Sequence, residues 1–180
     1  MATILALSGV TSIGAARDKG EGGAHRRHSY KGAWILRSIE IQSVAPNPDR
    51  CGAAVEVVFD VRGVDDLGGL YDAEISYCTD PNGQTNWDLK QTTTYAYING
   101  TTDLVCSPQT FAIDRAQCRT NWSPIQCVFT GGTGDLQGIK GSAVVTGLET
   151  GDPCDGSMAH NDNDAGAFWY QGSVFFPHRR

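Results

Sequence analysis

Most of this chain is a succession of short segments in which apolar and polar residues alternate, separated by clusters of Gly, Pro, Asp and Asn. The clearest case is residues 70–78, where one face carries Tyr71, Ala73, Ile75 and Tyr77. Alternation at every second residue is the period of a β-strand, whereas no long stretch of the sequence has the 3.6-residue period of a helix. The pattern therefore predicts an all-β protein.

About eight strands are expected, and their regular spacing by turns favours an antiparallel barrel or sandwich. The expected strands cover residues 34–43, 53–61, 70–78, 91–98, 101–106, 125–130, 139–148 and 167–176. Several of them carry aliphatic and polar side chains on both faces, which fits a barrel with a mixed interior better than a sandwich. An eight-stranded barrel either packs solid or holds one small ligand. Residues 112–118 are the one weakly helical stretch, too short for a helical layer.

Size and charge limit the partners that such a domain can have. The chain has 180 residues, enough for one domain with a full core, and a formal net charge of −6. An acidic protein is poorly suited to neutralising phosphates over a wide face, so nucleic acid and anionic membranes are not expected as partners. The sequence also lacks an apolar run of about 18 residues, so no membrane span is expected.

The N-terminal part differs in composition from the rest. The chain begins Met-Ala-Thr-Ile-Leu-Ala-Leu-Ser-Gly, and residues 17–31 then contain Gly, His and Arg with few large apolar residues. The apolar start lacks the basic residues that open an export signal, so we expect it to lie over the main domain as a lid. The predicted organisation is a lid and linker at residues 1–32 and a barrel domain at residues 33–180, in a cytoplasmic protein.

The most distinctive local sequence is Phe-Thr-Gly-Gly-Thr-Gly-Asp-Leu-Gln-Gly-Ile-Lys-Gly, which opens residues 129–147 and leads into an apolar strand. Its Gly, Lys and Ser spacing does not match a phosphate-binding loop. It resembles the signature of the allene oxide cyclase and dirigent superfamily, whose members are eight-stranded antiparallel barrels. Gly-Leu-Tyr-Asp at residues 69–72 is a shorter match, and the resemblance covers roughly residues 34–176. Within that superfamily, the chain looks most like the bacterial spirotetramate-forming 4+2 cyclases of polyketide pathways.

Such a resemblance implies an activity as well as a fold. The barrel interior would bind a linear polyene with a tetramate or tetronate head group and catalyse an intramolecular 4+2 cycloaddition of Diels–Alder type in antibiotic biosynthesis. This reaction needs no metal and no other cofactor, because holding diene and dienophile at reacting distance lowers the barrier, and a polar group at the dienophile carbonyl adds to it. The expected partner is this small molecule, and a homodimer is left open.

Two alternatives remain beside the cyclase. One is a non-catalytic, lipocalin-like protein that binds an apolar small molecule. The other is a secreted dirigent-like protein, stapled by disulfides, that steers the coupling of radicals generated elsewhere.

The cysteines bear on that choice. The chain has six, at Cys51, Cys78, Cys106, Cys118, Cys127 and Cys154. No C-x-x-C pair occurs, so a structural zinc site is not expected, and an even number allows either disulfides or buried thiols. Free buried thiols are favoured, partly on account of the resemblance, and the pairing stays open.

Two residues are candidates for the catalytic roles. Glu40, on the mixed face of the first strand, is costly to bury alone and could anchor a polar head group, unless it faces solvent. Gln109, after Pro108, could donate to a tetramate or tetronate carbonyl, unless it is an ordinary loop amide. The expected substrate-binding residues are Trp34, Asp72, Tyr95, Tyr97, Trp122 and Trp169. Alternatively, the aromatic residues pack in the core without binding substrate, and Asp72 lies on a solvent-facing side of its strand.

Overall fold

The computed structural model describes residues 27–80, 85–110, 112–114, 116–150 and 165–176, without the side chains of residues 34–42 and of a few single positions. In chain order the elements are β1 (His28–Pro46), α1 (Pro48–Cys51), β2 (Val55–Asp65), β3 (Gly69–Thr79), β4 (Thr85–Tyr95), β5 (Thr101–Cys106), β6 (Gln109–Thr110), β7 (Ala112–Asp114), β8 (Arg119–Gly132), η1 (Gly134–Leu136), β9 (Lys140–Thr150) and β10 (Ala165–Phe175).

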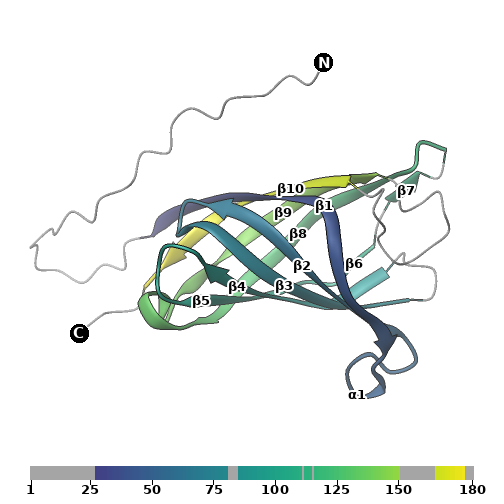
Figure 1. The fold of residues 1–180 in the computed structure, drawn as a ribbon, viewed down its shortest axis with the longest axis horizontal. Coiled ribbons are helices and arrows are strands. Elements are labelled where there is room, and N and C mark those ends of the chain that lie inside the picture. The colour runs from purple at the N-terminus through teal and green to yellow at the C-terminus, as the bar shows by residue number, and fades with distance from the viewer. Residues whose placement is uncertain (1–26, 81–84, 111, 115, 151–164, 177–180) are drawn as a thin grey trace, which may run out of the picture.

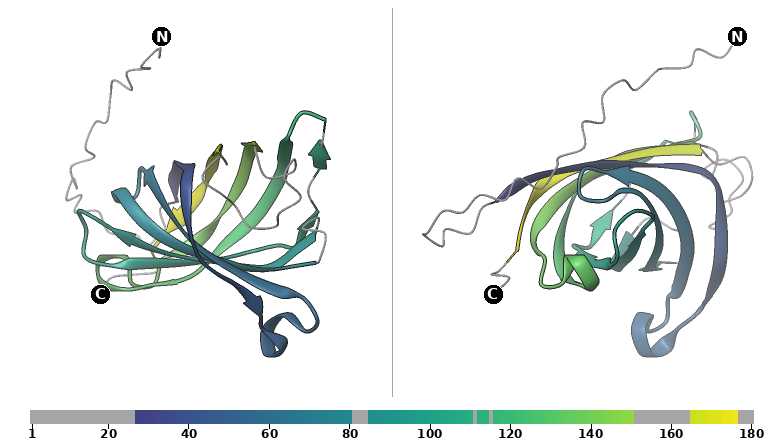
Figure 2. Two further views of the ribbon diagram at one scale, coloured as in Figure 1. Left: turned by 45° about the vertical axis from the view of Figure 1, so that its right-hand side comes forward. Right: turned by 60° about the vertical axis from the view of Figure 1, so that its left-hand side comes forward.

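Eight of the ten strands close into an antiparallel barrel (Figures 1 and 2). Each of β1 to β4 pairs with the next strand, β5 pairs with β8, and β8, β9 and β10 follow in order. Strand β10 then pairs back with β1, which closes the cycle. The short strands β6 and β7 lie outside it and pair with β4 and β8. The predicted all-β, eight-stranded antiparallel barrel is confirmed.

The strands are mostly longer than the alternation predicts. Strand β1 begins at His28, within the segment expected to be a linker, and residues 1–26, with the expected lid, lie outside the described residues. Strand β4 begins at Thr85 rather than residue 91. Asp88 in this strand has a left-handed φ of 50°, close to a register shift against β3. Such an irregularity interrupts the alternation, so the first half of β4 is hidden from a pattern search.

The weakly helical stretch expected at residues 112–118 is wrong. Strand β7 pairs with the beginning of β8, so this segment forms a short hairpin. The carboxylate of Asp114 accepts the backbone N–H groups of Ala116 and Gln117 at 3.0 and 3.1 Å. An Asp that binds the backbone two and three residues ahead starts a turn, which competes with a helix for the same N–H groups.

The two ends of the barrel are built differently. At one end β2 turns into β3 and β4 turns into β5, and we call it the tyrosine end for the tyrosines described below. Leu136 and Ile139, from the loop that contains η1, are buried in the core. The opposite end, where β3 ends and β4 begins and where β6 pairs with β4, we call the amide end. Every strand of the cycle runs between these two ends.

The short helix α1 is fastened to the outer side of the barrel. Cys51 at its end forms a disulfide with Cys78 of β3. The guanidinium of Arg50 donates to the carboxylates of Glu56 and Asp88 and to the side-chain oxygen and carbonyl of Ser76. These contacts tie α1 to β2, β3 and β4. None of the helices in the described part of the chain is long and apolar enough to cross a membrane.

Candidate functional site

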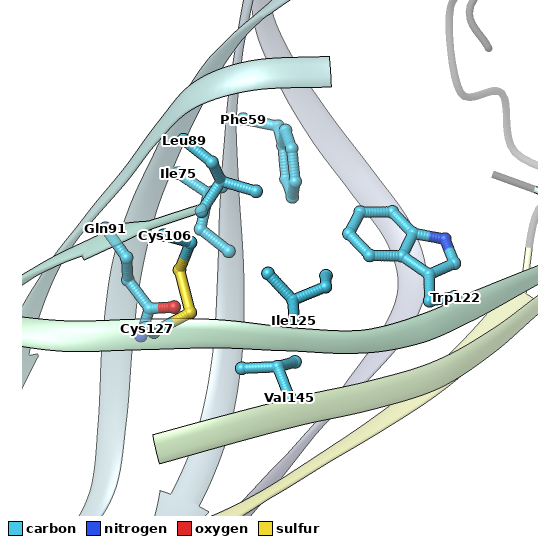
Figure 3. A pocket seen from close by; sticks show the side chains of 9 residues that line it. All are labelled: Phe59, Ile75, Leu89, Gln91, Cys106, Trp122, Ile125, Cys127 and Val145. Atoms are coloured by element: carbon cyan, nitrogen blue, oxygen red, sulfur yellow. A yellow bond between two sulfur atoms is a disulfide. The ribbon is translucent and has the colours of Figure 1, made fainter. Parts of the chain in front are cut away.

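An apolar pocket lies inside the barrel, in the half nearer the amide end (Figure 3). It contains about 330 Å³ of empty space, part of it open to solvent. Side chains from β2, β3, β4, β5, β8 and β9 converge on it: Phe59, Ile75, Leu89, Gln91, Cys106, Trp122, Ile125, Cys127 and Val145. A space with these walls suits an apolar body, and the carboxamide of Gln91 adds one polar group.

Strand β8 supplies three of the walls because its regular alternation is interrupted. Trp122 and Ile125 both line the pocket, although they are three residues apart, and the register between β8 and β9 shifts between them. Pro124 lies in this irregular stretch, where the missing N–H of proline is tolerated. From Ile125 onward the alternation resumes, so Cys127 and Phe129 also point inward and are buried.

The expectation of free thiols is wrong for the described cysteines. Cys106 is bonded to Cys127, Cys51 is bonded to Cys78, and Cys118 is also disulfide-bonded. Cys106 and Cys127 occupy directly opposed positions on β5 and β8, so their sulfur atoms meet inside the barrel and form part of the pocket wall. Cys154 lies outside the described residues. Pairing depends on the register of the strands, which the spacing of the cysteines along the chain does not show.

A polar cluster occupies the interior at the tyrosine end. Asp65 Oδ2 accepts hydrogen bonds from Tyr95 Oη at 2.8 Å and from Tyr30 Oη at 3.2 Å. Its Oδ1 accepts the backbone N–H groups of Leu67 and Gly68 at 3.0 and 2.9 Å. Burial raises the pKa of Asp65 above its ordinary value, against these four hydrogen bonds, which lower it.

Two further tyrosines complete this cluster. Tyr170 Oη donates to Tyr71 Oη at 2.6 Å, and the ring of Tyr170 stacks on that of Tyr30 with a centroid distance of 5.2 Å. Burial is the main cause that raises the pKa of Tyr30, Tyr71, Tyr95 and Tyr170. These phenols therefore stay protonated, and Tyr30, Tyr95 and Tyr170 act as hydrogen-bond donors. These four tyrosines do not line the pocket, and they fill the interior at the tyrosine end.

Glycines on neighbouring strands make room for two of these rings. A Cβ atom on Gly32 would lie 2.3 Å from Cε2 of Tyr170, and one on Gly63 would lie 2.3 Å from Cζ of Tyr71. Both distances are far shorter than any real contact, so a side chain at either position would displace a buried tyrosine. The glycines thus fix where the tyrosine hydroxyls meet.

The amide end carries two buried amides. Asn86 of β4 is 2% exposed and lies directly opposite Gln109 of β6. Asn86 Oδ1 and both amide atoms of Gln109 are buried without a hydrogen-bond partner among the described residues. A buried polar atom without a partner costs about 1–3 kcal/mol, so such atoms call for an explanation.

Three of the predicted site residues lie in the barrel interior. Trp122 lines the pocket, as expected for a wall of the binding site. Tyr95 is buried too, but in the Asp65 cluster at the tyrosine end rather than in the pocket. Gln109 lies at the amide end. The structure therefore does not bring these three residues into one site.

Three of the expected substrate-binding residues, Asp72, Tyr97 and Trp169, lie outside the pocket and are exposed. Asp72 is on the outer face of β3 and forms an exposed ion pair with Arg62 at 2.7 Å. Tyr97 is 75% exposed in the loop after β4, and Trp169 is 53% exposed because its neighbours in β10 point inward. Trp34 and Glu40 lie in β1, where Glu40 is opposite Asp60, but their side chains are outside the described part of the structure.

Sequence reasoning missed Gln91, Asn86 and Asp65. Gln91 shares the alternation of Leu89 and Tyr95, which was sufficient to place it inside the barrel. The irregular backbone at Asp88 interrupts the alternation of β4, so the sequence pattern does not show that Asn86 faces inward. Asp65 lies in the turn between two expected strands, and an Asp followed by Asp-Leu-Gly is typical of a carboxylate that binds the turn N–H groups.

Comparisons with known proteins add little to this geometry. No family model and no curated protein matches the chain. Among solved structures, the chain is similar to the pterocarpan synthase dirigent protein GePTS1, with 8% identity, 93% of this chain and 100% of that chain covered, and a TM-score of 0.45. Nothing in the comparisons concerns the spirotetramate-forming cyclases. A TM-score below 0.5 establishes no common family, so the closed barrel rests on its own strand pairing.

Proposed function

We propose that the barrel binds a largely apolar small molecule in its interior pocket and fixes the conformation of that molecule for a cyclisation or coupling step. The observation that carries this proposal is the pocket itself, with walls from six strands and one disulfide. The described residues of its lining include no charged side chain, so a charged body would lose its hydration against them without compensation.

The first candidate activity is a cofactor-independent 4+2 cyclase. In this proposal the rigid walls, Phe59, Trp122 and Ile125 among them, hold diene and dienophile together, which can supply several kcal/mol. The amides of Gln91 and Gln109 are the groups available to stabilise charge on a dienophile carbonyl. Glu40 and Gln109 remain the proposed pair for a tetramate or tetronate head group, and a cytoplasmic location belongs to this candidate.

Isomerisation of a suitable substrate tests this activity. The purified protein is incubated with a linear polyene that bears a tetramate head group, and the mixture is followed by liquid chromatography with mass and ultraviolet detection. A product of identical mass that has lost diene absorbance, formed faster than in buffer, supports a cyclase. The variant Val145→Phe fills the pocket and should abolish the reaction, whereas Val144→Phe, on the outer side of β9, should not. An unchanged substrate with every length of polyene tried would reject the cyclase.

The second candidate is a dirigent-like protein that steers the coupling of radicals generated elsewhere. The disulfides favour it, because disulfides persist in oxidising compartments and are rare in the cytosol. In this proposal the pocket covers one face of a bound aromatic radical, so that the second radical attacks its opposite face. The location expected for this candidate is outside the cytoplasm.

Product chirality separates the two candidates. A phenol is oxidised by an added one-electron oxidant with and without the protein, and the dimers are resolved by chiral chromatography. An excess of one enantiomer that Val145→Phe removes and Val144→Phe retains supports steering. A racemic product at saturating protein would reject it. If apolar molecules bind but neither assay shows an effect of the protein, the result favours the non-catalytic, lipocalin-like binding protein.

A further inference from the structure

We propose that Asn86 and Gln109 form a binding site for a neutral polar group that carries both a hydrogen-bond donor and an acceptor, such as a phenolic hydroxyl. The molecule bound is then amphipathic, with its ring body in the apolar pocket and its polar group at the amide end. This inference rests on the proposed binding of an apolar molecule in the pocket and adds the chemical class of that molecule.

The strand register places the two amides next to the pocket. Leu89 and Cys106, which line the pocket, are directly opposed on β4 and β5. Asn86 and Gln109 each lie three residues from this pair, toward the amide end, and are opposed to each other. Residues directly opposed in an antiparallel pair share a face. Asn86 is also opposed to Thr79, which continues the inward-facing alternation of β3 beyond Tyr77, so this face is the interior. The two amides therefore form the next layer of the barrel interior beyond Leu89 and Cys106.

The hydrogen-bonding capacity of this layer is unused. Asn86 Oδ1 and Gln109 Oε1 are acceptors, Gln109 Nε2 is a donor, and none has a partner among the described residues. The two side chains face each other across β4 and β6, yet neither oxygen nor Nε2 uses the other residue. Among the other buried polar side chains of the barrel, Gln91 and Tyr170 are bonded, whereas Thr102 Oγ1 is a single atom without a partner among the described residues. An arrangement that leaves three such atoms unbonded in one layer is built for a group from outside the chain.

The chemistry of the layer defines that group. A hydroxyl can donate to one amide oxygen and accept from Gln109 Nε2, which uses both of its capacities at once. The nearest charged side chains of β4, Asp88 and Lys90, lie on the outer side with Arg50, in the cluster that fastens α1. The two amides carry no charge of their own, so the site suits a neutral polar group.

A matched pair of probes tests this inference with the full chain. 2-Naphthol and 2-methylnaphthalene have the same ring body, but only the first has a hydroxyl. Their dissociation constants are measured by quenching of tryptophan fluorescence, for the native protein, Asn86→Leu, Gln109→Leu and the control Gln126→Leu on the outer face of β8. The native protein and the control should prefer 2-naphthol by roughly threefold to tenfold, the range expected for one or two neutral hydrogen bonds. Both interior variants should lose this preference and keep their affinity for 2-methylnaphthalene.

The other outcomes distinguish a failure of the proposed pocket from a failure of the proposed amide site. If neither probe binds the native protein, the pocket does not bind apolar molecules, and the proposed function fails together with this inference. If both probes bind equally to the native protein, or if the interior variants keep the preference, the pocket stands and the amide site is overturned. Thermal unfolding supplies the structural readout: each Leu variant should unfold at or above the native midpoint, because it removes unbonded polar atoms. Loss of folding in both variants would show that the amides serve the fold instead.

Discussion

Tyr170 donates a 2.6 Å hydrogen bond to Tyr71 across the barrel interior, although the two residues are 99 positions apart in the chain. They are not on neighbouring strands, because β1 and β2 lie between β10 and β3 in the sheet. The bond therefore ties two sides of the cylinder together through its interior, in a way that the ladder of backbone bonds does not. It exists because Gly32 and Gly63 leave space for the two rings.

Removing this bond should weaken the barrel as a whole. Tyr170→Phe deletes the donor and leaves the buried Tyr71 oxygen without it, so the free energy of unfolding should fall by about 1–3 kcal/mol. Chemical denaturation followed by far-ultraviolet circular dichroism measures the change. Tyr97→Phe removes a hydroxyl from an exposed side chain and serves as the control, with no change expected. Equal stability of Tyr170→Phe and the native protein would show that the bond contributes nothing.

The Asp65 carboxyl should make stability depend on pH in an unusual direction. Burial raises its pKa, so the folded state holds this proton more strongly than the unfolded state does. Its stabilising contribution is then complete below the unfolded pKa of about 3.9 and is lost as pH rises through the raised folded value. Relative to Asp65→Asn, the native protein should therefore lose stability as pH rises from about 4. Urea midpoints of both proteins at several pH values measure this, and a difference that does not vary with pH would contradict the raised pKa.

Arg50 should stabilise the barrel by fastening α1. Its side chain is largely buried and bonds two carboxylates and a serine, so Arg50→Ala should reduce the free energy of unfolding by about 1–3 kcal/mol. Arg62→Ala breaks the exposed pair with Asp72 and is the matched control. The denaturation midpoint of the control should stay at the native value. A midpoint of Arg50→Ala that also stays there would mean that α1 is fastened by the disulfide alone.

The same cluster should have the opposite pH dependence from Asp65. Hydrogen bonds from Asn47 and Arg50 lower the pKa of Glu56. Burial raises the pKa of Asp88, but the bonds from Arg50 and Lys90 outweigh it and lower the pKa overall. Carboxylates with lowered pKa values stabilise the fold above their ordinary pKa and lose this contribution as pH falls. The advantage of the native protein over Arg50→Ala should therefore shrink between about pH 5 and pH 2, and an advantage that stays constant over this range would contradict the assignment.

Peptide mapping without reductant should find Cys51 joined to Cys78 and Cys106 joined to Cys127. Replacing both Cys106 and Cys127 by Ala should cost about 3 kcal/mol, the usual effect of a loop of roughly 20 residues. The double variant also removes the sulfur wall of the pocket, so the affinity for 2-methylnaphthalene should change with it. Alkylation of all six cysteines in the unreduced, denatured protein would contradict the bonded state.

The strands were predictable because most of them have one buried face. In β3 the buried residues Tyr71, Ala73, Ile75 and Tyr77 follow the alternation of the sequence without interruption. In β10 the run Phe-Trp-Tyr is aromatic at every position, so the sequence does not tell which parity faces inward. The structure buries Phe168 and Tyr170, which turns Trp169 outward.

The site was less predictable because it depends on register and on irregular backbone. The Cys106–Cys127 disulfide and the opposed amides of Asn86 and Gln109 follow from which residues face each other across a pair of strands. The local pattern of one strand contains no information on that pairing. The irregular stretches at Asp88 and Pro124 then shift the alternation where the pocket begins. The residues that line a barrel are thus determined by its closure more than by any single segment.

The strand order also has a consequence for how this barrel folds. Each strand of the cycle pairs with the next one along the chain, apart from the seam between β1 and β10. Pairings between chain neighbours close short loops and form early, whereas the seam joins residues more than a hundred positions apart and carries the largest loss of chain entropy. Folding is therefore expected to proceed through an open meander of paired strands. The pairing between β1 and β10, which closes the barrel, is expected to form last. Sliding at this late step would move Tyr170 of β10 out of reach of Tyr30 and Tyr71 on the other side of the seam, so these tyrosine contacts favour the correct register at closure.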